Sequence, residues 1–179
     1  VLYKRGTSYE RIDEWEKANF KGLLKHATGS GKTITAIEAI RRHTKLGTPA
    51  LVIVPSKLLL QQWYREIKSE IDNTIIVLCG GGHSNWYKRG SVRTICSNFV
   101  KDTDGGIIIA VVDTASTKKF IEELRDLKNI LIVADEVHSM GSSNNSKILE
   151  HDFGKRLGLS ATPERYSDPV GTEKIFNFF

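Results

Sequence analysis

Residues 26–33 read HATGSGKT and contain the residue types that hold nucleotide phosphates. A phosphate loop usually reads Gly, four residues, Gly, Lys and then Ser or Thr, and here His26 replaces the leading Gly. Glycine amides can turn toward a common centre, Lys32 can place a charge beside the outer phosphates, and the Thr33 hydroxyl can ligate magnesium. The segment follows an apolar stretch and opens a helical one, which favours a working phosphate loop over a chance turn with a surface lysine.

Two adjacent acids, Asp135 and Glu136, come directly after the apolar run ILIVA at residues 130–134. An Asp at a strand end can hold magnesium, and an adjacent Glu can accept a proton from the water that attacks a terminal phosphate. The alternative is a pair of acids that cap a helix. Because ligands gather beyond the carboxyl ends of strands in parallel sheets, the catalytic interpretation is favoured.

Polar residues also follow two other apolar runs. Ser160 and Thr162 lie in LGLSATPER at 157–165, which taken alone would be an ordinary exit from a strand into a loop. Ser56 and Lys57 follow ALVIV and Pro55 and open a helical stretch. A helix start with a hydroxyl and a cation suits contact with a nucleic-acid backbone.

Apolar runs alternate with helical stretches along the chain. Strands are predicted at 22–25, 50–54, 75–79, 107–112, 130–134 and 156–160. Helices are predicted over 7–18, from 32 to a stop at Gly47, after a cap at Ser56, and over 116–127. Runs that are apolar throughout need cover on both faces, so the sequence predicts an α/β three-layer domain with a central parallel sheet.

Composition sets further limits on the protein. Lys and Arg outnumber Asp and Glu by 26 to 21, which is a mild bias toward polyanionic partners. Cys79 and Cys96 are too few for a disulfide framework, so an intracellular location is expected, in the cytoplasm or in the nucleus of a eukaryote. No apolar run approaches the roughly 20 residues that span a bilayer, and no membrane partner is expected. The start at Val1 and the apolar end at Phe179 suggest a piece of a longer protein.

The segments ATGSGKT, DEVH and SATP, in this order, closely resemble motifs I, II and III of superfamily 2 helicases and translocases. The family's phosphate loop commonly begins with Ala, as at Ala27, so His26 is compatible with it. PSKLLLQQW at 55–63 looks like motif Ia, although the helical spacing of Leu59, Leu60 and Trp63 indicates core packing. RLGLSATPER with the closing FNFF is most similar to the branch of RAD25-type excision-repair helicases and type III restriction motor subunits.

The resemblance implies a RecA-like P-loop fold and a single N-terminal helicase ATP-binding domain over 1–179. It implies ATP and Mg²⁺ as cofactors, nucleic acid as a partner, with DNA expected, and a second RecA-like domain of the same protein that completes the site. Without that second domain the chain is expected to hydrolyse ATP slowly. The implied roles are phosphate binding by Thr28, Gly29, Ser30, Gly31, Lys32 and Thr33; magnesium binding by Thr33 and Asp135; catalysis by Glu136 and Lys32; coupling by His138, Ser160 and Thr162; and nucleic-acid contact by Ser56, Lys57 and Thr114.

The sequence departs from the branch in two places. Residues 5–8 (RGTS) lack the Gln that reads adenine in the branch, so adenine selectivity is not implied. The family often has Thr and Tyr before the segment that corresponds to DTAS, whereas this chain has Val111 and Val112 there. The motif Ib contact is therefore expected to rest on Thr114 and Ser116.

Two other features allow more than one interpretation. The glycine-rich segment CGGGH at 79–83 matches no tetrahedral zinc spacing with Cys96 and is interpreted as a turn, with backbone phosphate contact left open. WYKR at 86–89 suits nucleic acid, or equally a solvated loop anchored by Trp86.

Two other classes of function compete with the motor. A non-motor P-loop NTPase, such as a small-molecule kinase, would not need SATP or motif Ia. A catalytically inactive nucleic-acid-binding module would not need Lys32, Asp135 and Glu136 together.

Overall fold

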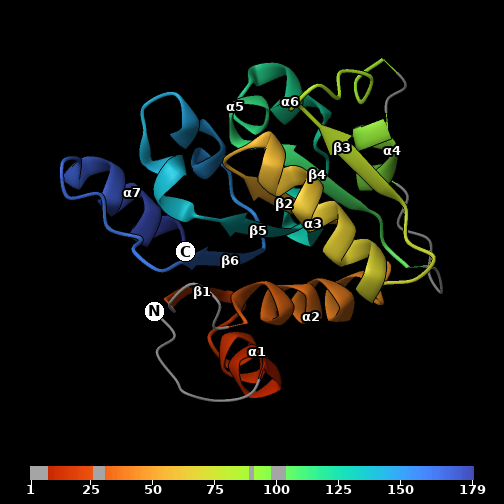
Figure 1. Ribbon diagram of the computed structural model, residues 1–179, viewed down its shortest axis with the longest axis horizontal. Coiled ribbons are helices and arrows are strands. Elements are labelled where there is room, and N and C mark those ends of the chain that lie inside the picture. The colour runs from red at the N-terminus through yellow and green to blue at the C-terminus, as the bar shows by residue number, and fades with distance from the viewer. Residues whose placement is uncertain (1–7, 26–30, 89–90, 98–103) are drawn as a thin grey trace.

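A six-stranded sheet forms the centre of the molecule (Figure 1). The structure is a computed structural model of the chain, and it describes residues 8–25, 31–88, 91–97 and 104–179. The strands are β1 (Lys21–Lys25), β2 (Ala50–Val54), β3 (Ile76–Cys79), β4 (Ile107–Val111), β5 (Leu131–Asp135) and β6 (Lys155–Ser160). They pair in the order β1-β6-β5-β2-β4-β3, and every pairing is parallel. The predicted α/β architecture with a central parallel sheet is therefore confirmed.

Helices connect the strands and cover both faces of the sheet. The α-helices are α1 (Ser8–Lys17), α2 (Lys32–Thr44), α3 (Lys57–Glu70), α4 (Ser91–Ser97), α5 (Val112–Ala115), α6 (Lys118–Glu123) and α7 (Pro169–Phe178). Three 3₁₀ helices are η1 (Leu127–Asn129), η2 (Val137–Gly141) and η3 (Asn145–Glu150). No helix among the described residues is long and apolar enough to cross a membrane.

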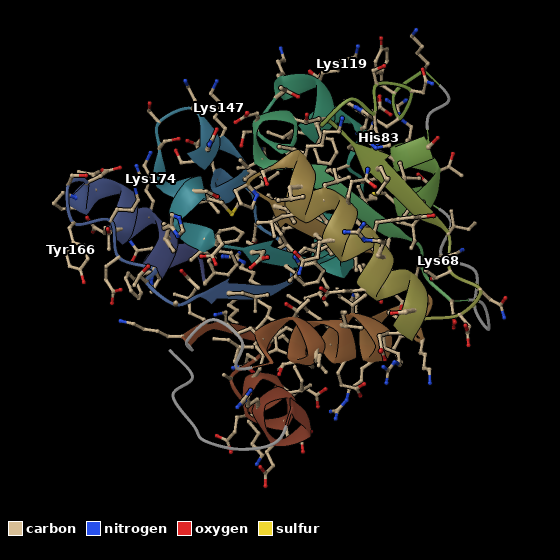
Figure 2. The ribbon with its side chains drawn as sticks, in the orientation of Figure 1. Lys68, His83, Lys119, Lys147, Tyr166 and Lys174 are labelled. Atoms are coloured by element: carbon tan, nitrogen blue, oxygen red, sulfur yellow. The ribbon has the colours of Figure 1, made fainter. Side chains whose placement is uncertain are left out.

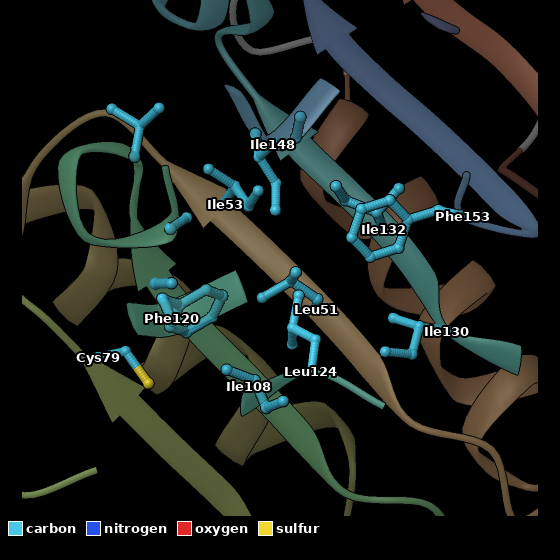
Figure 3. Packing of buried hydrophobic residues seen from close by; sticks show 14 of the residues in the cluster. Leu51, Ile53, Cys79, Ile108, Phe120, Leu124, Ile130, Ile132, Ile148 and Phe153 are labelled. Carbon is cyan, nitrogen blue, oxygen red and sulfur yellow. The ribbon is translucent and has the colours of Figure 1, made fainter. Parts of the chain in front are cut away.

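Alternation along each strand divides the core into two clusters. On β2, Leu51 and Ile53 point into one cluster, and Val52 and Val54 point into the other. Residues of α1, α2 and α3 complete the second cluster, whereas α4, α5, α6, η3 and α7 contribute to the first. Figure 3 shows Leu51, Ile53 and Ile132 packed with Phe120 and Phe153 in the first cluster. The strands are apolar throughout because both of their faces are covered.

Helix ends follow local capping chemistry in several places. The predicted cap at Ser56 is confirmed, since its side chain accepts a hydrogen bond from the Leu59 amide. The predicted start of α1 at residue 7 lies outside the described residues. The single helix predicted over 116–127 is wrong, because only Lys118–Glu123 of this segment is α-helical (α6). α5 ends before it at Ala115, Thr117 caps α6 by accepting from the Phe120 amide, and η1 begins at Leu127.

Two helices have no counterpart in the sequence-based prediction, α4 and α7. Asp168 caps α7 by accepting from the Gly171 amide, and Pro169 follows at the first helical position. These residues are a recognisable start signal. The aromatic end of α7 then packs into the first cluster through Phe178.

Candidate functional site

Four of the candidate functional segments follow the carboxyl ends of neighbouring strands. They follow β1, β2, β5 and β6, which are neighbours in the order β1-β6-β5-β2. Because all of these strands are parallel, their carboxyl ends meet at the same edge. The sheet order thus places the ends of these four strands, at Lys25, Val54, Asp135 and Ser160, at the same side of the sheet.

The end of the phosphate loop is positioned by α2. Gly31 is the N-cap of α2 and has φ 80°, a left-handed conformation that glycine adopts without steric cost. Lys32 and Thr33 then occupy the first turn of the helix, where backbone amides point outward. Residues 26–30, which include the predicted phosphate ligands Thr28, Gly29 and Ser30, lie outside the described residues.

Lys32 and Thr33 share a cleft of about 560 Å³ with the two acids that follow the Ala134 position. The cleft runs between α2 and α3, and its lining residues are Gly31, Lys32, Thr33, Ile34, Ile37, Leu59, Gln62, Glu66, Ser69, Glu70, Asp135 and Glu136. One cleft therefore brings together the cation of Lys32, the hydroxyl of Thr33 and the carboxylates of Asp135 and Glu136. Hydroxyl and carboxylate oxygens are the ligands that Mg²⁺ prefers, so this donor set fits the ion.

Asp135 ends β5, and each of its carboxylate oxygens accepts one hydrogen bond. Its Oδ1 accepts from the Glu136 amide at 3.0 Å, and its Oδ2 accepts from Nε1 of Trp63 at 2.8 Å. Trp63 lies on α3 and is 1% exposed. Core packing is confirmed for Leu60 and Trp63. The hydrogen bond from the indole N–H to Asp135 has no signal in the sequence, because the two residues are 72 positions apart.

Glu136 connects the segment after β5 to the end of β6. The hydroxyl of Ser160 donates to Oε2 of Glu136 at 3.4 Å and accepts from the Thr162 amide at 3.2 Å. Nδ1 of His138 lies 3.4 Å from the same Oε2. Within the described part of the chain this buried nitrogen makes no hydrogen bond. Two of the three predicted coupling residues, Ser160 and His138, therefore lie beside one carboxylate, and the backbone amide of Thr162 is linked to it through Ser160.

Two charged residues of the 157–165 segment make contacts that no sequence pattern indicates. Glu164 forms an ion pair with Lys25, at the end of β1, and this partner lowers the pKa of the Glu164 carboxyl. Arg165 donates to the carbonyl of His138 and to Oδ2 of Asp168. These contacts tie the exit of β6 to the residues that precede the phosphate loop and to those that follow the acids.

The predicted nucleic-acid contacts lie at the neighbouring strand ends. Lys57 is exposed in the first turn of α3, and Thr114 is half-buried on α5. The glycine-rich turn after β3 lies between them: a Cβ on Gly80 would be 2.2 Å from Thr114 Oγ1, and one on Gly81 would be 3.2 Å from Cβ of Lys57. Ser116 is different, because it is buried and donates to the carbonyl of Asn145.

A second cleft, of about 550 Å³, opens beside this turn. It is lined by residues that include His83, Tyr87, Thr114 and Lys119, of which Figure 2 labels His83 and Lys119. The ammonium of Lys119 lies 3.2 Å from the centre of the Tyr87 ring. Trp86, by contrast, is 8% exposed and packs in the core, so it anchors the loop.

Known proteins are similar to this chain in sequence and in fold. Residues 3–165 match the family model described as "Type III restriction enzyme, res subunit". A relative from Halobacterium salinarum, "Putative DNA 3'-5' helicase Rad25", is 30% identical over 173 residues, which cover 90% of this chain and 26% of the relative. "Putative ATP-dependent RNA helicase QP509L" from an African swine fever virus isolate (Pig/Kenya/KEN-50/1950) is 31% identical over 151 residues, which cover 83% of this chain and 26% of the relative.

Solved structures agree on the fold. The Pyrococcus furiosus Hef helicase domain superposes with a TM-score of 0.67 at 22% identity, covering 97% of this chain and 36% of the other. The parallel sheet therefore defines a RecA-like α/β domain. The chain belongs to the type III restriction enzyme res subunit family and is a superfamily 2 helicase domain. It spans 26% of the length of each of the two curated relatives named above.

Proposed function

We propose that the chain is the ATP-hydrolysing domain of a motor that translocates on or unwinds nucleic acid, with duplex DNA as its track. The observation that carries the proposal is the single cleft that brings Lys32 and Thr33 beside Asp135 and Glu136. The hydrogen bond from Ser160 to Glu136 adds a path from this cleft to the exit of β6. A relative named as a DNA helicase supports DNA as the track, and one named as an RNA helicase makes RNA the alternative to test.

Each residue has a role that follows from its chemistry. Lys32 places a positive charge on the outer phosphates, and Glu136 accepts a proton from the attacking water. Thr33 and Asp135 would hold magnesium, which supplies charge neutralisation of the phosphates when bound. Ser160 and His138 contact the carboxylate of Glu136. A change in the position or charge of this carboxylate would shift Ser160 and, through its hydrogen bond, Thr162.

The position of Gly31 at the start of α2, beside the cleft, supports phosphate binding by this loop. We assign Thr28, Gly29 and Ser30 to phosphate binding with it, and Ser56, Lys57 and Thr114 to the nucleic-acid backbone. The natural protein would supply a second RecA-like domain with the arginines that complete the site. The use of ATP and nucleic acid supports the proposal of an intracellular location.

The test is the ATPase rate of the natural protein that contains this chain, measured without nucleic acid, with duplex DNA and with duplex RNA. Strong stimulation by duplex DNA is expected. The variants Lys32→Ala and Glu136→Gln should lose at least about a hundredfold in rate, since each removes a group used in the transition state. The 179-residue chain alone should be slower than the natural protein by about a thousandfold, because an arginine finger is worth that much.

Equal rates in all three conditions would identify a non-motor P-loop NTPase. Unchanged behaviour of Glu136→Gln would identify a nucleic-acid-binding module without catalysis.

A further inference from the structure

The indole N–H of Trp63 donates a hydrogen bond to the side chain of a candidate functional residue. Burial alone would require only that this N–H find some acceptor. Trp63 is 1% exposed and packs in the cluster that α2 and α3 share with the sheet. A buried indole N–H needs an acceptor, and backbone carbonyls usually provide one. Here the acceptor is Oδ2 of Asp135, 2.8 Å away and 72 residues later in the chain.

This contact completes a pair of donors around one carboxylate. The Glu136 amide occupies Oδ1 of Asp135, so the hydrogen bond from Trp63 to Oδ2 fixes the rotation of the carboxylate about its last bond. Each oxygen of an ionised carboxylate has two acceptor positions, so one on each oxygen stays available after these bonds. Partners that orient a metal-binding group commonly change metal affinity as strongly as some of the ligands do.

We propose that Trp63 is a positioning residue that orients the Asp135 carboxylate for magnesium. The inference rests on the proposed function, because it takes Asp135 as a magnesium ligand. It also gives α3 a second role. The helix that begins at the proposed nucleic-acid contacts Ser56 and Lys57 carries, six residues further on, the donor that holds the magnesium-binding side chain.

The chain provides a matched control in Trp15. This residue is 2% exposed, packs in the same cluster, and donates from Nε1 to the backbone carbonyl of Arg156 at 2.9 Å. Trp15→Phe and Trp63→Phe therefore remove the same amount of buried ring and one buried hydrogen bond each. Only Trp63→Phe removes a donor from Asp135.

The experiment measures binding of a fluorescent ATP analogue by the natural protein over a range of Mg²⁺ concentrations and in excess chelator. Trp63→Phe is expected to raise the Mg²⁺ concentration needed for half-maximal binding about tenfold. Nucleotide affinity in chelator should stay within about twofold of wild type, a result that a general loss of structure would not give. Trp15→Phe should leave both values unchanged, and Asp135→Asn should abolish the magnesium dependence.

An equal response of Trp63→Phe and Trp15→Phe, with Asp135→Asn still defective, would overturn the inference and leave the proposed function standing. Wild-type protein that binds nucleotide without any response to Mg²⁺ would instead overturn the magnesium site on which both rest. If Trp63→Phe does not fold, site-specific replacement of Trp63 by its benzothiophene analogue keeps the bicyclic shape and removes only the N–H. That variant must show the same rise in Mg²⁺ requirement, and a wild-type requirement would overturn the inference.

Discussion

Glu136 is held in a backbone conformation that costs free energy. Its φ of 46° and ψ of 58° are left-handed, a region that disfavours side chains with a Cβ by about 1 kcal/mol or more. The conformation turns the chain sharply after β5, so that Asp135 and Glu136 reach the same cleft from adjacent positions. The sequence predicted both acids from their place after an apolar strand. It could not predict the ion pair of Lys25 with Glu164, because the partners are 139 residues apart and neither belongs to a local pattern.

Arg165 provides a test of how firmly the exit of β6 is held. Arg165→Ala removes the hydrogen bonds to the His138 carbonyl and to Asp168. It should lower the free energy of unfolding by about 1–3 kcal/mol, because charged donors are lost and the carbonyl is left without its partner. Denaturant unfolding measures the change.

The matched control for Arg165 is Arg93, whose side chain is 51% exposed and pairs with Glu123 on the surface. Arg93→Ala should cost at most about 1 kcal/mol, as exposed ion pairs do. Equal losses in the two variants would contradict the assignment of Arg165 as a structural tie.

At the scale of elements, the predicted strands agree with the observed ones to within about one residue, whereas the helices agree less well. Fully apolar strands are recognisable because the sheet is covered on both faces. The helix expected over 116–127 fails because Thr117 can both continue a helix and cap a new one, and tertiary packing of Phe120 decides between these. Most of the site could be predicted because it consists of short segments at strand ends. The glycine-rich turn after β3 could be located, but its contacts with two separate segments could not.

Gly80 tests whether that turn organises the nucleic-acid contacts. Gly80 has φ 82°, and a Cβ there would collide with Thr114 Oγ1. Gly80→Ala should therefore displace Thr114 and weaken duplex binding by about tenfold, equivalent to about 1.4 kcal/mol. Nucleotide affinity should not change, and fluorescence anisotropy with labelled duplex measures the difference.

Gly47 is the matched control, because its φ of 78° is almost the same and it lies after the end of α2. Gly47→Ala introduces similar backbone strain without approaching Lys57 or Thr114. Weaker duplex binding in Gly47→Ala by the same factor would show that strain alone, and not the displacement of Thr114, explains the result.

At the scale of the whole molecule, His43 connects α2 to the amino-terminal ends of the strands, on the side of the sheet opposite the cleft. Its Nε2 lies 3.1 Å from the carbonyl of Pro49 and 3.0 Å from that of Asn129, and Lys155 Nζ lies 3.2 Å from its Nδ1. Pro49, Asn129 and Lys155 stand at the starts of β2, β5 and β6. Burial, together with the charge of Lys155, lowers the pKa of His43 to about 4.

This pKa predicts a loss of stability in mild acid. A histidine in the unfolded chain titrates near 6.5, so between about pH 6.5 and pH 4 the unfolded state binds the proton and the folded state does not. The contribution is complete above pH 6.5 and decreases as pH falls. Between pH 7 and pH 5 the free energy of unfolding should drop by about 2 kcal/mol from this group.

Unfolding of His43→Gln at the two pH values should show a smaller drop than wild type. His151, which is partly exposed after η3, provides the control, because His151→Gln leaves the buried imidazole in place. A pH dependence in His43→Gln equal to that of wild type would contradict the prediction.

The position of β1 at the edge of the sheet also has a consequence for synthesis on the ribosome. β1 is made before the other five strands of this sheet, yet its partner in the sheet is β6, and Trp15 just before it donates to the carbonyl of Arg156, 141 residues later. At roughly 5–20 residues per second, the nascent chain waits on the order of 10 s before this partner emerges. The strand that leads into the phosphate loop is thus the last to be secured, and a truncated translation product would carry the phosphate-loop sequence without the neighbour that positions it.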